Sequence, residues 1–138
     1  MNLAQRCLRF DSLHAVAKEQ YDLGGMLFER AMEGGVKERM RFLTKSAVAF
    51  RSALRGYSKD KFPKNWADAQ FSLGLVLFKQ AELRRWPMRR ILLCKSTDAF
   101  RKALKVYSKD KFPEKWGAIN ENLRSALRFS FWRDPGMC

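Results

Sequence analysis

The stretch KSAVAFRSALRGYSKDKFP at Lys45 to Pro63 occurs again as KSTDAFRKALKVYSKDKFP at Lys95 to Pro113. The two stretches are identical at 14 of 19 positions, lie 50 residues apart and align without a gap. The segment Ala17 to Ala31 aligns in the same way with Ala67 to Ala81, and a fainter third copy begins at Trp116. Internal repeats this similar indicate one structural unit that is copied and stacked.

Each unit contains two helical patterns. In the first pattern Leu73, Leu77 and Ala81 recur every four residues, which predicts one buried helix face and a helix over about 66 to 84, with its counterpart at about 16 to 33. The second pattern is an apolar stripe that ends at Tyr57 in one unit and at Tyr107 in the other. The SKDKFP sequence then closes the unit, because a residue before proline avoids helical geometry. No segment shows the alternation of a strand, so we predict an all-α chain.

The order of these patterns predicts a single helical-repeat domain over residues 1 to 138. We expect an N-terminal partial unit at 1 to 15 with a short helix around Leu3 to Phe10, a first repeat at 16 to 65 and a second repeat at 66 to 115. A last helix from Trp116 to about Phe131, with a tail, completes residues 116 to 138.

The pattern of Leu73-Gly74, Phe100, Ala103-Leu104 and Pro113 resembles the signature of the tetratricopeptide repeat family. The usual unit of that family has about 34 residues, and this chain is similar to a long-helix variety with a 50-residue unit. The resemblance covers about residues 16 to 130. It implies an α-solenoid of stacked antiparallel helix pairs, in a right-handed superhelix, that acts as a protein interaction scaffold.

Composition sets further bounds. A hydrophobic content of 46% in 138 residues is enough for one folded domain. The longest apolar stretches have four residues, far below the roughly 20 that cross a bilayer, and residues 1 to 15 lack the apolar segment of a secretory signal. We therefore expect no membrane span and a cytoplasmic protein. The spacing of Cys7, Cys94 and Cys138 suggests neither a zinc site nor a disulfide framework, and Cys94 reads as a small core residue.

The first candidate surface follows from the resemblance, which implies that the first helix of each unit lines a concave ligand-binding face. By register, the side chains on that face would be Tyr21, Phe28, Phe71, Phe78, Lys79 and Arg128. An aromatic groove of this kind suits an apolar or amphipathic helix from a partner. The alternative is that tightly curled helices bury these aromatic residues in the core.

The second candidate surface is a basic ladder on the second helix of each unit. It consists of Arg51, Arg55, Lys59, Arg101, Lys105 and Lys109, and an arginine cluster at a turn adds Arg84, Arg85, Arg89 and Arg90. The net charge of +14 favours an acidic partner: nucleic acid, anionic lipid or acidic protein. The alternative is that the ladder is only the solvated face of a duplicated helix.

The third candidate surface lies at the C-terminal end. A chain that starts and ends on incomplete units either caps its stack or packs its last helix against the beginning of the next chain. Phe129, Phe131 and Trp132 are the candidates for this contact, and a head-to-tail contact yields a ring or a filament. In the alternative, these aromatic residues fold back as a cap.

The chain lacks the features of an enzyme. It has one histidine, no glycine-rich phosphate loop, no nucleophile elbow and no repeated carboxylate pair, so we predict no catalysis, no cofactor and no metal. We expect a non-catalytic protein interaction scaffold that binds polypeptides, including copies of itself. The alternative function is binding of nucleic acid or another polyanion through the basic ladder.

Overall fold

The computed structural model describes residues 2 to 131, and this part of the chain contains five α-helices and no strand. They are α1 (Leu3–Glu33), α2 (Val36–Gly56), α3 (Pro63–Glu82), α4 (Met88–Leu104) and α5 (Pro113–Phe131). The prediction of an all-helical chain is thus confirmed. Gly34 and Gly35 form the turn between α1 and α2, as their sequence suggests.

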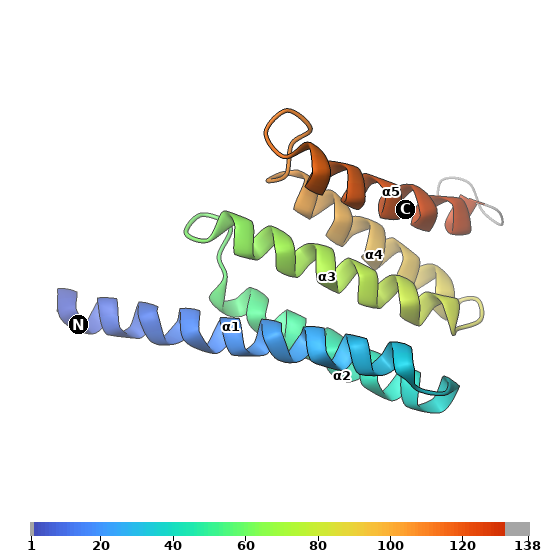
Figure 1. The fold of residues 1–138 in the computed structure, drawn as a ribbon, viewed down its shortest axis with the longest axis horizontal. Helices are drawn as coiled ribbons and strands as arrows, with labels where there is room; N and C mark the ends of the chain where they lie inside the picture. The colour runs from blue at the N-terminus through green and yellow to red at the C-terminus, as the bar shows by residue number, and fades with distance from the viewer. Residues whose placement is uncertain (1, 132–138) are drawn as a thin grey trace.

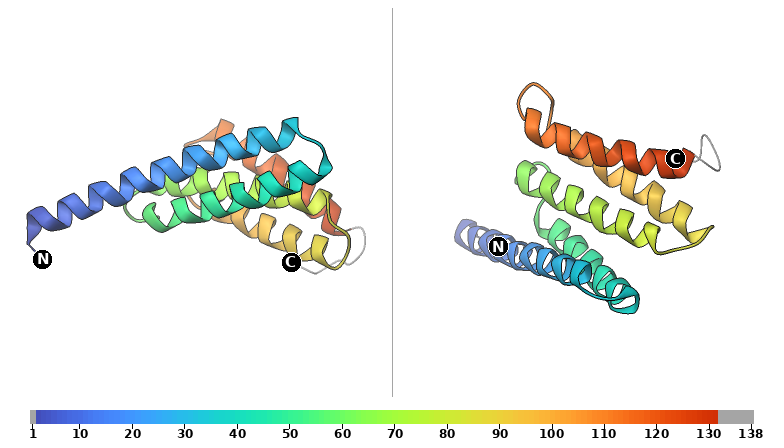
Figure 2. Two further views of the ribbon diagram at one scale, coloured as in Figure 1. Left: turned by 90° about the horizontal axis from the view of Figure 1, so that it is seen from below. Right: turned by 45° about the vertical axis from the view of Figure 1, so that its right-hand side comes forward.

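Each helix packs against its neighbours along the chain (Figures 1 and 2). The closest pairs are α1 with α2 and α3 with α4, and these two hairpins meet where α2 contacts α3. The last helix, α5, packs on α4. In Figure 1, α1, α3 and α5 face the viewer while α2 and α4 lie behind them. The helices therefore form a front layer of first helices and a back layer of second helices.

Helix α1 is longer than expected. The prediction of a separate short helix around Leu3 to Phe10 is wrong, because α1 runs without a break from Leu3 to Glu33. The reason lies at residue 13: α3 and α5 both begin at a proline, whereas the equivalent residue 50 positions before Pro63 is Leu13. Asn2 caps the helix instead, and its side chain accepts a hydrogen bond from the Gln5 amide at 2.8 Å.

Residues 50 positions apart make the same contacts within the two hairpins. The Ser46 hydroxyl donates to the carbonyl oxygen of Gly24 at 2.7 Å, and the Ser96 hydroxyl donates to that of Gly74 at 2.7 Å. These bonds hold the helices so close that a Cβ on Gly24 would lie 2.8 Å from the Phe50 ring. On Gly74 it would lie 2.5 Å from the Phe100 ring. Both hairpins thus use the same serine and glycine to seat a phenylalanine.

The helix ends repeat too. The Arg39 guanidinium donates to the carbonyl oxygen of Ala31 at 3.2 Å, and Arg89 donates to that of Ala81 at 3.0 Å. Each arginine donates to a carbonyl in the last turn of a first helix, and the carbonyl of Ala81 also accepts from the Arg84 amide at 3.2 Å. These arginines are structural anchors of the hairpins.

The buried side chains form three clusters along the stack. One joins α3, α4 and α5 around Phe100, and a second joins α1, α2 and α3 around Phe50. The third lies where the end of α2 meets α1, around Ala17, Ala53 and Tyr57. Each cluster is shared by helices that are consecutive or nearly consecutive in the chain.

Gly24 and Gly25 offer an internal comparison of the close helix contact. We expect Gly24→Ala to lower the free energy of unfolding by about 1 to 3 kcal/mol, because its Cβ would overlap the buried Phe50 ring. A Cβ on Gly25 meets nothing within 4 Å, so Gly25→Ala should raise the free energy by about 1 kcal/mol through helix propensity. Urea unfolding followed by circular dichroism measures both, and equal effects would contradict this account.

Tyr107 connects α3 with the end of α4. Its hydroxyl donates to the Asp68 carboxylate at 2.7 Å, and Lys115 of α5 forms an ion pair with the same carboxylate oxygen at 3.2 Å. Burial, reinforced by the hydrogen bond to Asp68, raises the pKa of the Tyr107 phenol above its ordinary value of 10.0. The folded state thus holds this proton more tightly than the unfolded chain does.

The stabilisation from this proton is present in full below about pH 10 and is lost as the pH rises towards the pKa of the folded state. We expect Tyr107→Phe to lower the free energy of unfolding at pH 7 by about 0.5 to 1.5 kcal/mol, the usual net value of one hydrogen bond. The variant should also lose less stability than the parent between pH 9 and pH 11. Parallel alkaline unfolding curves for the two proteins would refute the role of Tyr107.

Candidate functional site

The residues predicted for a peptide groove lie at the contact between helices. Phe78 is buried in the cluster of α3, α4 and α5, and Phe71 packs against the same cluster with its ring centroid 5.8 Å from that of Phe100. Tyr21 and Phe28 are half-buried against the cluster of α1, α2 and α3. These four aromatic side chains therefore contribute to the core.

The two charged members of the groove prediction are more accessible. Lys79 is half-buried and pairs with Glu82 at 3.1 Å on the same helix. Arg128 is exposed on α5. The six residues thus divide between core packing and ordinary helix surface.

Replacement of Phe78 separates the two interpretations of the aromatic residues. We expect Phe78→Ala to lower the free energy of unfolding by about 3 to 5 kcal/mol, because it leaves a cavity in a packed cluster. Phe129 is the matched control, since it is half exposed and its ring packs edge-on against Phe78 with centroids 5.6 Å apart. Phe129→Ala should cost only about 0.5 to 1.5 kcal/mol, the value of an aromatic pair. Similar costs, measured by urea unfolding, would contradict the core position of Phe78.

The basic ladder is exposed along its whole length, but the prediction that it lies on helices alone is wrong, because Lys59 and Lys109 lie in the loops after α2 and α4. All six residues (Arg51, Arg55, Lys59, Arg101, Lys105 and Lys109) are exposed, and within residues 2 to 131 none of them forms an ion pair with an acidic side chain. The last lysine of the ladder in each repeat lies over a tryptophan ring. The Lys59 Nζ is 5.6 Å from the Trp66 ring centroid, and the Lys109 Nζ is 5.2 Å from that of Trp116.

Charge separates between the two layers of helices. Helix α2 has six basic residues and one acid, a net of +5, and α4 has five basic residues and one acid, a net of +4. The front layer is nearly neutral: α1 has four basic residues and five acids, α3 has two of each, and α5 has three basic residues and two acids. The back layer therefore holds most of the positive charge of the chain.

The arginine cluster at the α3–α4 turn divides by role. Arg84, Arg85 and Arg90 are exposed and add charge beside α4. Arg89 is half-buried and donates to the carbonyl oxygens of Ala81 at 3.0 Å and Glu82 at 3.2 Å. The sequence signal for this anchoring role is the equivalent Arg39, which lies 50 residues earlier.

Of the three residues predicted for an assembly contact, the structure places one in full. Phe129 packs against Phe78, which resembles the folded-back alternative, and it keeps about half of its surface exposed. Phe131 is the last residue of α5, and its side chain lies outside what the structure describes. Trp132 lies outside the described residues.

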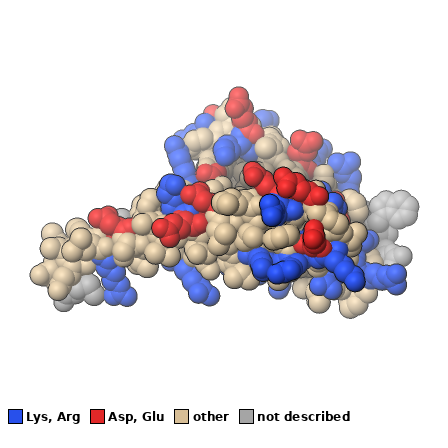
Figure 3. Space-filling view, turned by 60° about the horizontal axis from the view of Figure 1, so that its bottom comes forward, with Lys and Arg blue, Asp and Glu red and all other residues tan. Residues whose placement is uncertain are grey.

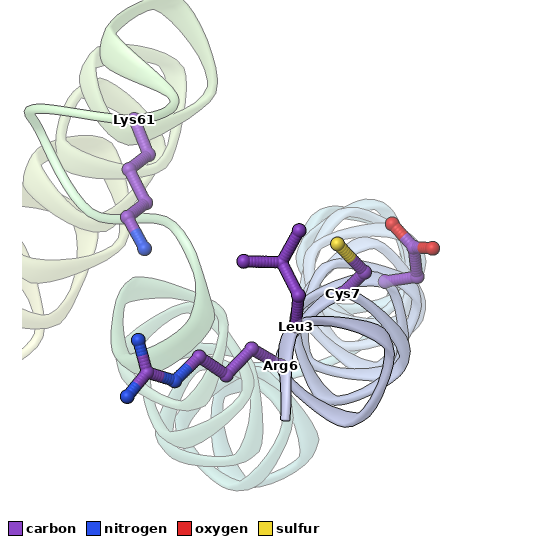
Figure 4. A pocket seen from close by; sticks show the side chains of 5 residues that line it. Leu3, Arg6, Cys7 and Lys61 are labelled. Atoms are coloured by element: carbon purple, nitrogen blue, oxygen red, sulfur yellow. The ribbon is translucent and has the colours of Figure 1, made fainter. Parts of the chain in front are cut away.

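Two open pockets lie alongside α1. One of about 380 Å³ is lined by Leu3, Arg6, Cys7, Asp11 and Lys61. Figure 4 shows Leu3 directed towards Lys61 of the α2–α3 loop, with Arg6 extending over α2. The second pocket, of about 370 Å³, is lined by Leu13, Val16, Ala17, Gln20, Ser52, Arg55 and Gly56. Both are mainly apolar recesses beside the N-terminal half of α1, a region that the sequence prediction did not single out.

Other features bear on reactivity and location. Cys7 is free and exposed, whereas Cys94 is half-buried and disulfide-bonded, so the expectation that Cys94 is only a core thiol is wrong. Among the described residues, no group of three or more His, Cys, Asp or Glu side chains is placed to hold a metal ion. None of the helices within residues 2 to 131 has the length and apolar character needed to span a bilayer.

Comparisons of the chain with known protein families, with curated proteins and with solved structures found no match. The likeness to tetratricopeptide repeats therefore depends on the residues of this chain alone.

Proposed function

We propose that this chain is a non-catalytic helical-repeat module of the tetratricopeptide type, and that its back layer binds the phosphate backbone of nucleic acid. The observation that carries the proposal is the separation of charge, with net charges of +5 on α2 and +4 on α4 beside nearly neutral front helices. Successive hairpins with the same internal contacts support the solenoid part of this proposal.

The ladder suits an extended polyanion. Arg51 and Arg55 lie one turn apart on α2, a rise of about 6 Å. Lys59 and Lys109 lie in the loops after α2 and α4, and the same basic positions recur on the next hairpin. Basic side chains that neutralise phosphates release the counterions condensed on the nucleic acid, which gives affinity without base specificity. Aromatic faces lie among the basic side chains, because the half-buried rings of Trp66 and Trp116 lie beside Lys59 and Lys109. Proteins that bind single-stranded nucleic acid use this combination, since the bases stack on the aromatic rings.

Salt-dependent binding tests this proposal. We expect the chain to bind a fluorescent single-stranded oligonucleotide of mixed sequence with micromolar affinity in dilute buffer. The affinity should fall steeply as salt rises, with a slope that counts the phosphates contacted. The variant Arg51→Gln/Arg55→Gln/Arg101→Gln/Lys105→Gln should weaken binding at low salt about tenfold or more and flatten the slope.

The matched control is Lys18→Gln/Lys79→Gln/Arg124→Gln/Arg128→Gln, which removes the same charge from the front layer. It should change affinity far less than the ladder variant does. Equal losses would show that net charge alone binds the oligonucleotide and would refute the ladder as a site. Binding to poly-glutamate that exceeds binding to the oligonucleotide would assign the ladder to acidic proteins instead.

Binding of polypeptides, including copies of the chain itself, is the second candidate function. The observation that favours it is the set of exposed leucines on α1, since Leu3, Leu8 and Leu13 are 79%, 69% and 49% exposed. These side chains lie at the opposite end of the stack from α5 and point in different directions around α1.

A further inference from the structure

Three positions on each front helix form one face in all three copies. On α3 they are Ala69, Leu73 and Val76, which are buried, and the last two pack in the cluster shared with α2. On α5 the equivalent residues are Ile119, Leu123 and Ala126, which are buried in the cluster shared with α4. In both cases a helix of the back layer covers the face.

On α1 the same three positions are uncovered. They are Glu19, Leu23 and Met26; Glu19 is exposed, Leu23 is 42% exposed and Met26 is 67% exposed. Val16 lies one turn earlier on this face and is also exposed. The helix face that is covered on α3 and α5 is therefore exposed to solvent on α1.

The first turns of α1 extend this open surface. They project past the end of the hairpin, as Figures 1 and 2 show, and they carry Leu8, which is 69% exposed and lies a whole number of turns before Met26, on the same side of the helix. Figure 3, which brings this end of the molecule forward, shows a mostly uncharged projection at the left. Apolar side chains that stay in water forgo the free energy of burial. A helix segment without tertiary packing is also only marginally stable.

The opposite end of the stack does not match this surface. The positions at which α3 receives α4 include Gly74 and Phe78, and the equivalent residues of α5 are Arg124 and Arg128. Both arginines are exposed. An apolar face set against two guanidinium groups would remove charges from water without compensation. A head-to-tail contact of α1 with α5 is therefore disfavoured.

The charge of α1 suits contact between like faces. This helix has four basic residues and five acids, a net of −1, so the remainder of the +14 chain has a net charge of +15. Two copies that meet through α1 bring together the least repulsive part of each molecule. Contact through the back layers would instead oppose two strongly basic surfaces.

We infer that two copies of this chain pair through α1, with the two helices antiparallel about a twofold axis. The overhang of each copy then lies along Leu23 and Met26 of the other, so that the same apolar face is buried on both sides. At 1.5 Å per residue the 31 residues of α1 span about 46 Å, long enough for a continuous helix pair. The inference rests on the polypeptide-binding function proposed above and is independent of the basic ladder.

Sedimentation equilibrium tests the pairing directly. The full chain should sediment at twice its mass of 16.2 kDa at micromolar concentration. Leu23→Asp/Met26→Asp should weaken the dimer at least tenfold. Because both residues are exposed, helix content by circular dichroism should stay unchanged. Val48→Asp is the matched control, since Val48 is 57% exposed on α2 and its counterpart in the second hairpin is Asp98; it should leave the dimer intact.

Two further readouts separate this inference from nucleic-acid binding. Glu19→Leu should tighten the dimer about tenfold, because it completes the apolar triad found on α3 and α5. Added salt should strengthen the dimer, since it screens repulsion between two basic chains, whereas it weakens oligonucleotide binding. A monomer at 100 µM, a ring or filament, or a dimer unchanged by Leu23→Asp/Met26→Asp would overturn the inference and leave the ladder proposal untouched.

Discussion

The close approach of two helices at a glycine is the contact on which the rest of this structure depends. Gly24 and Gly74 leave room for the rings of Phe50 and Phe100, and a serine hydroxyl bonds to each glycine carbonyl from the facing helix. The distance between the two helices is thereby fixed from both sides, by a ring that fills the gap and by a hydrogen bond that closes it. Because both hairpins share this contact, their two helices pack in the same way, and equivalent residues of the two repeats lie on equivalent surfaces.

A rigid hairpin explains how charge can be unevenly distributed. The second helix of each unit contributes serine, alanine and phenylalanine to the contact, and its remaining positions are free to carry arginine and lysine. Among the first helices, only α3 packs on two main neighbours, whereas α1 and α5 pack on one each and still carry little net charge. The basic back layer therefore reflects the duplication of a helix whose solvent positions carry arginine and lysine.

Much of the helical content could be predicted from the sequence, because a period of 50 residues and an apolar face every three to four residues are visible without a structure. The start of α1 could not, since it depends on a residue that is missing: Leu13 replaces the proline that begins α3 and α5, and nothing else stops the helix. The aromatic groove illustrates a second limit. Periodicity places Phe71 and Phe78 on one helix face, but whether that face meets solvent or another helix is set by the curvature of the whole stack.

Arg124 has a consequence for how many units an array of this kind can contain. Tandem duplication lengthens a repeat protein only if the terminal helix can accept another copy of its usual neighbour. Here the residue equivalent to Gly74 is Arg124, and its side chain stands at the position where glycine makes room for a phenylalanine ring in both hairpins. A hairpin added on α5 would therefore not seat its phenylalanine in the way that Phe50 and Phe100 are seated, unless Arg124 were replaced by glycine.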